Sequence, residues 1–161
     1  MSLNVLEGHF NSGSHTFAIV AAKFNQAVVD RLVEGALDGL RRHGVADKSI
    51  TLVRVPGSYE IPLVASKLAS SGKFSSIICL GAVIKGETDH YDHVAGASAN
   101  GIASISLQTG VPVIFGVLTC DTLEQAINRA GAKAGNKGFE AALTAIEMAD
   151  LISKLPNYRK F

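Results

Sequence analysis

The chain has 161 residues, of which 47% are hydrophobic and 18% are charged, and its formal net charge is +1. This length is enough for one domain with a sizeable core of its own. The sequence contains neither an apolar run of about 18 residues nor a long basic run, so we expect no membrane and no nucleic acid among its partners.

Apolar runs typical of buried strands alternate with segments of helical periodicity along the chain. In chain order we predict a strand over residues 16–22, a helix over 25–43, a strand over 50–55, a helix over 60–71, a strand over 76–84, a helix over 92–109, a strand over 113–119, and helices over 122–130 and 137–155. Residues 1–14 are interpreted as an irregular segment with a short strand around 4–6. Residues 15–155 are predicted to form a single domain, followed by a tail over 156–161.

Strands that alternate with helices require right-handed crossovers, and they predict a parallel sheet covered by helices on both faces. Continuous apolar strands fit this arrangement, because each face of the sheet then packs against a helical layer. The predicted fold is a flavodoxin-like three-layer α/β/α sandwich with a four-stranded parallel sheet. Such sheets bind ligands beyond the carboxyl ends of their strands, so the residues that follow each strand are the first candidates for a site.

The two cysteines, Cys79 and Cys120, each lie late in an apolar run. We interpret them as buried free thiols of a reducing compartment. The sequence has no C-x-x-C pair and no H-E-x-x-H motif, so no metal site is predicted. The N-terminal residues show no basic region followed by an apolar stretch, which favours a cytoplasmic location, or a plastid one after removal of a transit peptide.

The first two strands end at residues that could face a ligand. Phe24 and Asn25 follow the first strand, and the turn from Ser58 through Tyr59 to Glu60 follows the second. For Phe24 alone, burial in the core is favoured over an exposed platform for a flat ring. For Glu60, a favourable carboxylate in the first turn of a helix and a ligand for sugar-like hydroxyl groups are about equally supported.

The end of the third strand carries the most informative combination of residues. Its buried run is followed by Gly86, Glu87, Thr88 and His90, and a helix of small residues begins shortly afterwards. Free N–H groups at a helix start attract anions, and an imidazole beside them can move protons near neutral pH. The segment therefore predicts an enzyme that acts on a phosphorylated small molecule. His93, one turn further on, is better interpreted as a solvated histidine.

Two basic residues lie at the ends of the last two predicted helices. Arg129 falls in a last turn, where a cation interacts favourably with the helix dipole, whereas Lys137 falls in a first turn, where it does not. The second placement favours a ligand role for Lys137. The glycine-rich link between them is not a P-loop, because it lacks G-K-[ST] and joins two helices.

Four motifs in this order resemble the lumazine synthase family of riboflavin biosynthesis. They are KFN at 23–25, VPGSYEIP at 55–62, GAVIKGET at 81–88 with His90, and NRAG at 128–131 continuing through KAGNKG at 133–138. The resemblance extends over about residues 6–151. It implies a transferase that condenses 5-amino-6-(D-ribitylamino)uracil with 3,4-dihydroxy-2-butanone 4-phosphate. The products would be 6,7-dimethyl-8-ribityllumazine, phosphate and water, formed without a metal or an organic cofactor.

The resemblance also implies a role for each candidate residue. Phe24 would stack on the pyrimidine ring, and His90 would shuttle protons. Phe115 would close the pocket and Arg129 would complete the phosphate site, both from a neighbouring subunit. Pyrimidine and ribityl binding would fall to Asn25, Ser58, Tyr59, Glu60, Val83, Lys85 and Lys137, and phosphate binding to Gly86, Glu87 and Thr88.

An assembly is part of the same expectation. Members of the family form homo-pentamers with active sites between adjacent subunits, and many close into shells of sixty subunits. The small residues over 92–109 would allow helices to pack closely around a five-fold axis. The short link from Gly131 to Gly138 favours the shell, with an associated or encapsulated riboflavin synthase as a further partner.

Two other interpretations stay open. One is a riboflavin synthase of the archaeal kind that is related to lumazine synthase. The other is a flavodoxin-like binding module, or a shell, that holds a lumazine or a flavin without turnover. A phosphorylated receiver domain is disfavoured, because Lys23, Phe24 and Asn25 occupy the strand end where its acidic cluster would lie.

Overall fold

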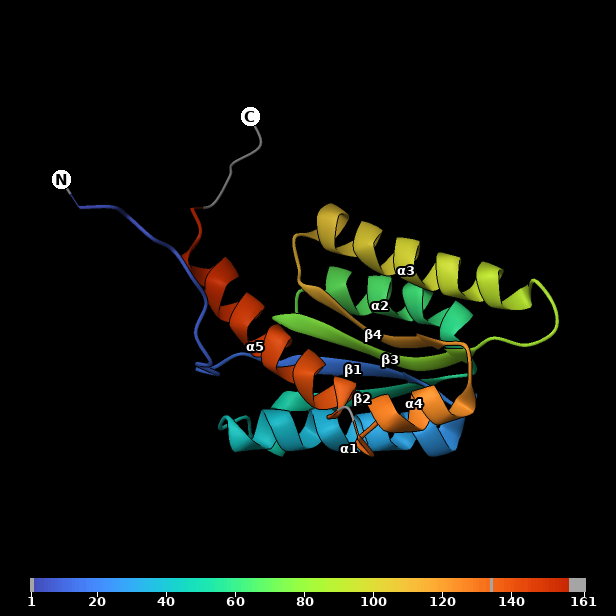
Figure 1. Cartoon of the computed structure of the whole chain (residues 1–161). Helices are drawn as coiled ribbons and strands as arrows, with labels where there is room; N and C mark the ends of the chain where they lie inside the picture. Colours follow the sequence, from blue (N-terminus) through green and yellow to red (C-terminus); the bar gives the residue numbers. More distant parts are fainter. Residues whose placement is uncertain (1, 134, 157–161) are drawn as a thin grey trace.

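The strands pair in the order β2-β1-β3-β4, and helices cover both faces of the sheet (Figure 1). The computed structural model describes residues 2–133 and 135–156. The strands are β1 (Phe17–Ala22), β2 (Ile50–Val55), β3 (Ser76–Ile84) and β4 (Val113–Cys120). The helices are α1 (Gln26–Arg42), α2 (Ile61–Ser70), α3 (His90–Thr109), α4 (Leu123–Arg129) and α5 (Lys137–Lys154), with 3-10 turns η1 (Asp47–Ser49) and η2 (Ser58–Glu60). The predicted flavodoxin-like α/β/α sandwich is confirmed.

The two central strands diverge at their carboxyl ends. All three strand pairs are parallel, and the pairing of β1 with β3 stops at Ala21 and Leu80. Beyond that point β3 continues to Ile84 beside β4, while the end of β1 stays beside β2. The direction of winding therefore reverses between β1 and β3, and a crevice opens there.

Strand side chains alternate between two cores because successive residues point to opposite faces of a sheet. Phe17 and Ile78 pack in the core beneath α1, α4 and α5, whereas Val20 and Ile77 pack in the core beneath α2 and α3. Figure 1 shows α1, α4 and α5 on one side of the sheet and α2 and α3 on the other. The strands thus form a rigid platform on which the connecting segments are held.

The link between α4 and α5 is tied to α1 by a single asparagine. The Asn136 side-chain amide donates to the carbonyl groups of Arg31 (2.9 Å) and Ala130 (3.0 Å), and its Oδ1 accepts from the Phe139 amide (3.1 Å). Next to it, Gly138 lets α5 approach α1 so closely that a methyl group there would overlap the Leu32 carbonyl. These contacts fix where α4 ends and where α5 begins.

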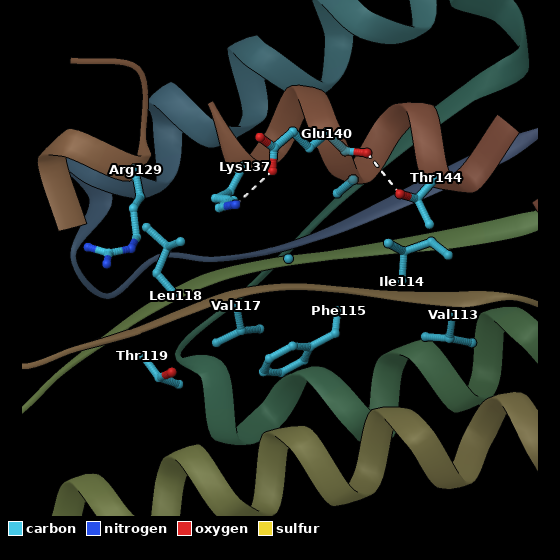
Figure 2. Close-up of a pocket in the computed structure, with 12 residues that line it drawn as sticks. Val113, Ile114, Phe115, Val117, Leu118, Thr119, Arg129, Lys137, Glu140 and Thr144 are labelled. Carbon is cyan, nitrogen blue, oxygen red and sulfur yellow. Dashed lines mark hydrogen bonds and ion pairs between the residues drawn. The ribbon is translucent and has the colours of Figure 1, made fainter. Parts of the chain in front are cut away.

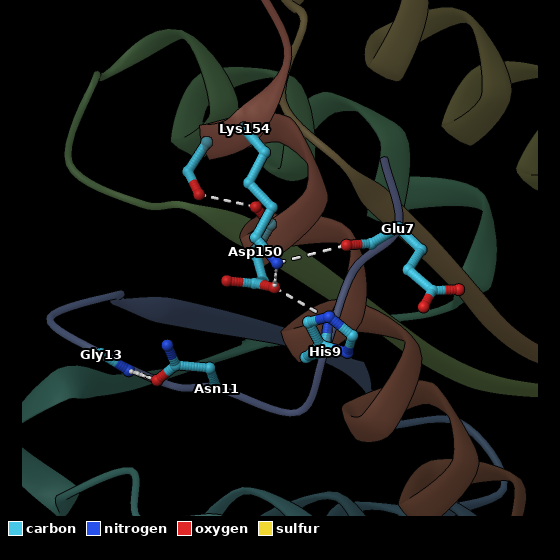
Figure 3. Close-up of polar contacts among 7 residues, drawn as sticks. Glu7, His9, Asn11, Gly13, Asp150 and Lys154 are labelled. Carbon is cyan, nitrogen blue, oxygen red and sulfur yellow. Dashed lines mark hydrogen bonds and ion pairs between the residues drawn. The ribbon is translucent and has the colours of Figure 1, made fainter. Parts of the chain in front are cut away.

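The prediction of a strand around residues 4–6 is wrong, because these residues do not pair with a strand in the described part of the chain. An extended segment needs a partner for its backbone groups, and here the segment leaves the domain with Leu3 and Val5 exposed. Its base is held on α5, where the His9 amide donates to Asp150 (2.8 Å) and Lys154 contacts both Asp150 and the Glu7 carbonyl (Figure 3).

Two further details differ from expectation. Helix α3 begins at His90, two residues earlier than predicted, and the Asp89 carbonyl accepts from the amides of Asp92 and His93 in its first turn. Strand β2 is not uniformly buried, because it lies at the edge of the sheet and exposes Thr51 and Leu52. The earlier helix start places His90 itself on a helix.

Candidate functional site

A cavity of about 720 Å³ lies where the winding of the sheet reverses, at the carboxyl ends of β1 and β3. Three segments form it: the end of β1, the turn that follows β2, and the connection from β3 into α3. It is lined by Phe24, Asn25, Pro56, Gly57, Ser58, Tyr59, Glu60, Ala82, Val83, Ile84, Gly86, Thr88, His90, Tyr91, His93 and Val94. Parallel α/β sheets bind ligands in this position.

The end of β1 presents an aromatic ring to the cavity. Phe24 is 72% exposed, so its interpretation as a core residue is wrong. The next residue, Asn25, has a left-handed backbone (φ 58°) and precedes α1, and its side-chain amide donates to the Ala82 carbonyl of β3 (2.8 Å). That bond spans the gap between the diverging strands β1 and β3. A strand end and a sharp turn therefore direct the Phe24 ring away from the core.

The turn after β2 contributes one buried hydroxyl and two exposed side chains. Ser58 is buried, whereas Tyr59 and Glu60 are exposed at the rim. The Glu60 carboxylate folds back over Gly57, where a Cβ atom would lie 3.1 Å from Glu60 Oε2. The Phe24 amide donates to the Pro56 carbonyl (3.0 Å), which ties this turn to the aromatic ring. The segment presents hydroxyl and carboxylate oxygens, which suit a polyhydroxylated chain.

The connection from β3 into α3 is exposed and rich in backbone donors. Within the described residues, the amides of Gly86, Glu87 and Thr88 donate to no protein acceptor, and the Thr88 hydroxyl accepts only a long bond (3.5 Å) from the His90 amide. His90, the first residue of α3, is exposed and borders the same cavity. These unpaired amides come directly before the N-cap residue of α3, Asp89. Such an arrangement is suited to an anion, and an imidazole beside it is able to accept a proton.

A second cavity, of about 630 Å³, lies along the edge strand β4 and the helices α4 and α5 (Figure 2). It contains Phe115, Arg129 and Lys137. In Figure 2, Phe115 points from β4 toward the layer of α2 and α3, whereas Arg129 and Lys137 lie on the α4 and α5 side. Lys137 pairs with Glu140 (2.8 Å), which accounts for a cation in the first turn of α5.

The predicted site residues thus divide between two places in the chain. The first cavity brings together Phe24, Asn25, Ser58, Tyr59, Glu60, Val83, Gly86, Thr88 and His90, and the second holds Phe115, Arg129 and Lys137. Lys85 and Glu87 line neither cavity, and the Lys85 amide is already bonded to the Cys120 carbonyl (2.8 Å). The division follows from topology, because β4 forms one edge of the sheet whereas the first cavity lies between central strands.

Sequence reasoning missed several residues of the first cavity. Tyr91, His93 and Val94 all line it from α3. His93 is exposed, which agrees with its interpretation as a solvated histidine. It also lines the cavity, on the same side of the helix as His90. Three-residue spacing on one helix is the signal that predicts this shared face.

The two thiols take no part in either cavity. Cys79 and Cys120 are free and buried, and burial raises the pKa of both. Cysteines with raised pKa values are poor nucleophiles near neutral pH. In the described ranges, no group of three or more histidine, cysteine, aspartate or glutamate side chains is arranged to hold a metal ion. No helix in those ranges is both long enough and apolar enough to span a bilayer.

Comparison with known families gives a match that covers most of the chain. The sequence model of the family described as 6,7-dimethyl-8-ribityllumazine synthase matches residues 14–153. The matched range includes both cavities and all of the predicted site residues.

Proposed function

Because the chain belongs to the 6,7-dimethyl-8-ribityllumazine synthase family, whose members are transferases that form a lumazine in riboflavin biosynthesis, we propose the two substrates on which it acts. They are 5-amino-6-(D-ribitylamino)uracil and 3,4-dihydroxy-2-butanone 4-phosphate. The observation that carries the proposal is the cavity between β1 and β3, where an exposed aromatic ring, a hydroxyl-rich turn, free backbone amides and an imidazole meet.

The pyrimidine substrate is proposed to lie between the end of β1 and the turn after β2. Phe24 stacks on the flat ring, because an exposed aromatic side chain gains contact area and ring stacking when a heterocycle covers it. Asn25, Ser58, Tyr59 and Glu60 face the ribityl chain. Backbone groups of Val83 and Lys85 bind the pyrimidine edge; for Lys85 the available group is the carbonyl, since its amide is occupied.

The phosphate is proposed to bind at the start of α3. Backbone amides of Gly86, Glu87 and Thr88, together with the Thr88 hydroxyl, donate to its oxygen atoms. Arg129 from a neighbouring copy of the chain supplies the positive charge, because the chain's own Arg129 lies in the separate cavity along β4. Phe115 and Lys137 reach the pyrimidine from that same neighbouring copy.

The chemistry requires protons to move at each stage. The 5-amino group attacks the butanone carbonyl and a first water leaves as the imine forms. The phosphate is then eliminated and the resulting enol becomes a methyl ketone. The ribitylamino nitrogen closes the ring on that ketone, and a second water leaves. His90 accepts and returns protons in these steps, because an imidazole can do both near neutral pH. Arg129 and the amides at the start of α3 stabilise the departing phosphate. Holding both reactants in one cleft supplies much of the remaining acceleration.

The proposed assembly is a homo-pentamer, with the shell of sixty subunits as its larger form and riboflavin synthase as an associated partner. Its support is the division of the site residues: β4 presents Phe115 at the sheet edge, where an adjacent copy could place its first cavity. The short link between α4 and α5 and the small residues of α3 leave room for close packing.

The direct test is to mix the purified protein with both substrates and follow the fluorescence and absorbance of the lumazine. We expect product only when both substrates are present, with one phosphate released per lumazine. No lumazine from a correctly assembled protein would contradict the proposal. Conversion of added lumazine into riboflavin, without the other substrates, would identify the protein instead as a riboflavin synthase.

A further inference from the structure

Ser58, the buried serine of the proposed ribityl site, is held in place by a hydrogen bond from Ser98 of α3. Ser98 is fully buried, and its hydroxyl donates to the Ser58 carbonyl (2.9 Å), sharing the proton with the Val94 carbonyl of its own helix (2.8 Å). A buried carbonyl without a donor is costly, so this bond determines where the turn rests on α3. Ser98 lines neither cavity, so it acts on the site through the residues it bonds, and of these only Ser58 belongs to the proposed ribityl site.

A glycine of β3 holds the same serine from the other side. Gly81 is packed so closely that a methyl group there would overlap the Ser58 hydroxyl, and its Cβ would lie 3.4 Å from Ile61 Cδ1. The Ser58 side chain consequently rests directly on the backbone of a central strand. Any larger residue at position 81 must displace the Ser58 hydroxyl from this position.

The Ser58 hydroxyl is available to bind a ligand. Ser58 is 5% exposed and lines the first cavity, but its hydroxyl forms no hydrogen bond with another described residue. Its position is thus set by packing against Gly81 and by the bond to its carbonyl from Ser98. A polar group held in this way loses little conformational entropy when it binds a ligand.

We propose that Gly81 and Ser98 are positioning residues that together fix the Ser58 hydroxyl for the ribityl chain of the pyrimidine substrate. This inference rests on the proposed function, because it names the substrate whose affinity the two residues control. Neither residue lines the first cavity, and neither forms a side-chain bond to the proposed phosphate-binding segment 86–88.

The test uses two variants, each with a matched control. Ser98→Ala removes the bond to the turn. Ser106→Ala removes another side-chain bond of the same helix, the one that the Ser106 hydroxyl accepts from the Val113 amide (2.9 Å), away from the first cavity. Gly81→Ala inserts a methyl group against Ser58, and Gly39→Ala inserts one between α1 and α5, where its Cβ would lie 3.0 Å from that of Ala142. Melting temperatures of all four variants report the purely structural cost.

We expect Ser98→Ala and Gly81→Ala to raise KM for the ribitylaminouracil about threefold to tenfold, the effect of misplacing one neutral hydrogen bond. KM for the butanone phosphate should stay at the wild-type value. The two controls should lower the melting temperature by similar amounts without changing either KM. If the controls raise KM for the ribitylaminouracil as much as the two variants do, the proposed positioning role is wrong.

A double-mutant cycle with Ser58→Ala separates positioning from general loosening of the fold. If Gly81 acts through the Ser58 hydroxyl, Gly81→Ala should change KM far less in the Ser58→Ala background than in the wild type. Additive effects in an active enzyme would overturn the inference and leave the proposed function standing. Absence of lumazine formation by the wild-type protein would overturn both. If Gly81→Ala does not fold, the Ser98→Ala and Ser106→Ala pair gives the same decision.

Discussion

His90 is the residue whose replacement distinguishes proton transfer from substrate positioning. We expect His90→Ala to lower kcat by roughly 10- to 100-fold, at or below the low end of the range for general acid–base groups, because positioning of two reactants supplies the rest. Steady-state assays with both substrates measure the effect. His93→Ala, which alters the same face of α3, serves as the control and should change kcat less than threefold, within the scatter expected of a contact that transfers no proton. Complete loss of activity in a correctly assembled His90→Ala protein would contradict the mainly positional mechanism.

Arg129 tests the proposed phosphate site. Arg129→Ala should raise KM for the butanone phosphate about 10- to 100-fold, the magnitude of a lost charge-assisted hydrogen bond, and should leave KM for the pyrimidine nearly unchanged. Arg42→Ala is a suitable control, because the Arg42 side chain forms an exposed ion pair with Asp38 on α1 and lines neither cavity. An unchanged KM for the butanone phosphate in Arg129→Ala would show that the assignment is wrong.

Asn25 carries both an unusual backbone conformation and a cross-strand bond, and two substitutions separate them. Asn25→Gly keeps the left-handed conformation and loses the bond to Ala82, whereas Asn25→Ala loses the bond and strains the backbone. Because a left-handed conformation costs about 1–2 kcal/mol for residues other than glycine, we expect the alanine variant to be less stable by about 1 kcal/mol. Urea denaturation measures the difference, and equal free energies of unfolding would exclude a role for the backbone strain.

The case of Phe24 shows what the sequence could predict about single residues. Large apolar side chains are mostly buried in folded proteins, so the sequence predicts burial for the Phe24 side chain considered by itself. The ring is exposed because Asn25 turns the chain sharply, and neither that turn nor the Asn25 bond to Ala82 has a periodic signal in the sequence. The family motifs predict a binding role for both residues, and the structure places both at the first cavity.

At the scale of elements, the N-terminal segment is attached to α5 through a carboxylate that titrates in acid. The Lys154 ammonium and the His9 amide hold the pKa of Asp150 below its usual value of 3.8. A lowered folded-state pKa means that this stabilisation is present above about pH 4 and is lost as the pH falls through the folded-state pKa. We therefore expect residues 7–9 to detach from α5 only in acid, well below neutral pH (Figure 3).

Hydrogen exchange of the N-terminal peptide, corrected for the intrinsic rate at each pH, measures this detachment. Asp150→Ala should expose the peptide at pH 7, whereas Asp38→Ala, which breaks an exposed ion pair on α1, should leave its protection unchanged. Equal protection of the peptide in wild type and Asp150→Ala at pH 7 would show that apolar packing, rather than the carboxylate, holds the segment.

The boundaries of most elements followed from local sequence signals. Strands β2 and β3 have the predicted bounds, because apolar runs ended by proline, glycine or charged residues define buried strands well. The failures concern partners that the local sequence does not specify. A strand around residues 4–6 has no second strand to pair with among the residues that the structure describes, and the exposure of β2 depends on its place at the edge of the sheet.

At the scale of the whole molecule, the predicted site residues divide into two sets that belong to different regions of one chain. His90 lies at the carboxyl ends of the central strands, and Arg129 lies beside the edge strand β4. Sequence motifs cannot reveal this separation, because order along the chain does not give distance in space. The proposed site combines both sets by taking one from each of two adjacent copies, so catalysis is predicted to depend on assembly.

Subunit mixing tests that dependence directly. His90→Ala and Arg129→Ala chains each carry one intact half of the proposed shared site, so a mixed oligomer regains complete sites wherever the two kinds of chain meet in the right order. Equal random mixing in a closed ring with one heterologous interface per site restores both halves in about a quarter of the sites. At a butanone phosphate concentration well below the KM of Arg129→Ala, where each single variant is nearly inactive, activity should therefore rise to about a quarter of the wild-type value. Co-expression with two affinity tags, followed by tandem purification and assay, provides the mixed oligomer. The double variant His90→Ala with Arg129→Ala, co-expressed with wild type, controls for expression. If activity equals the mean of the two single variants, all the catalytic residues act within one chain and the shared site is excluded.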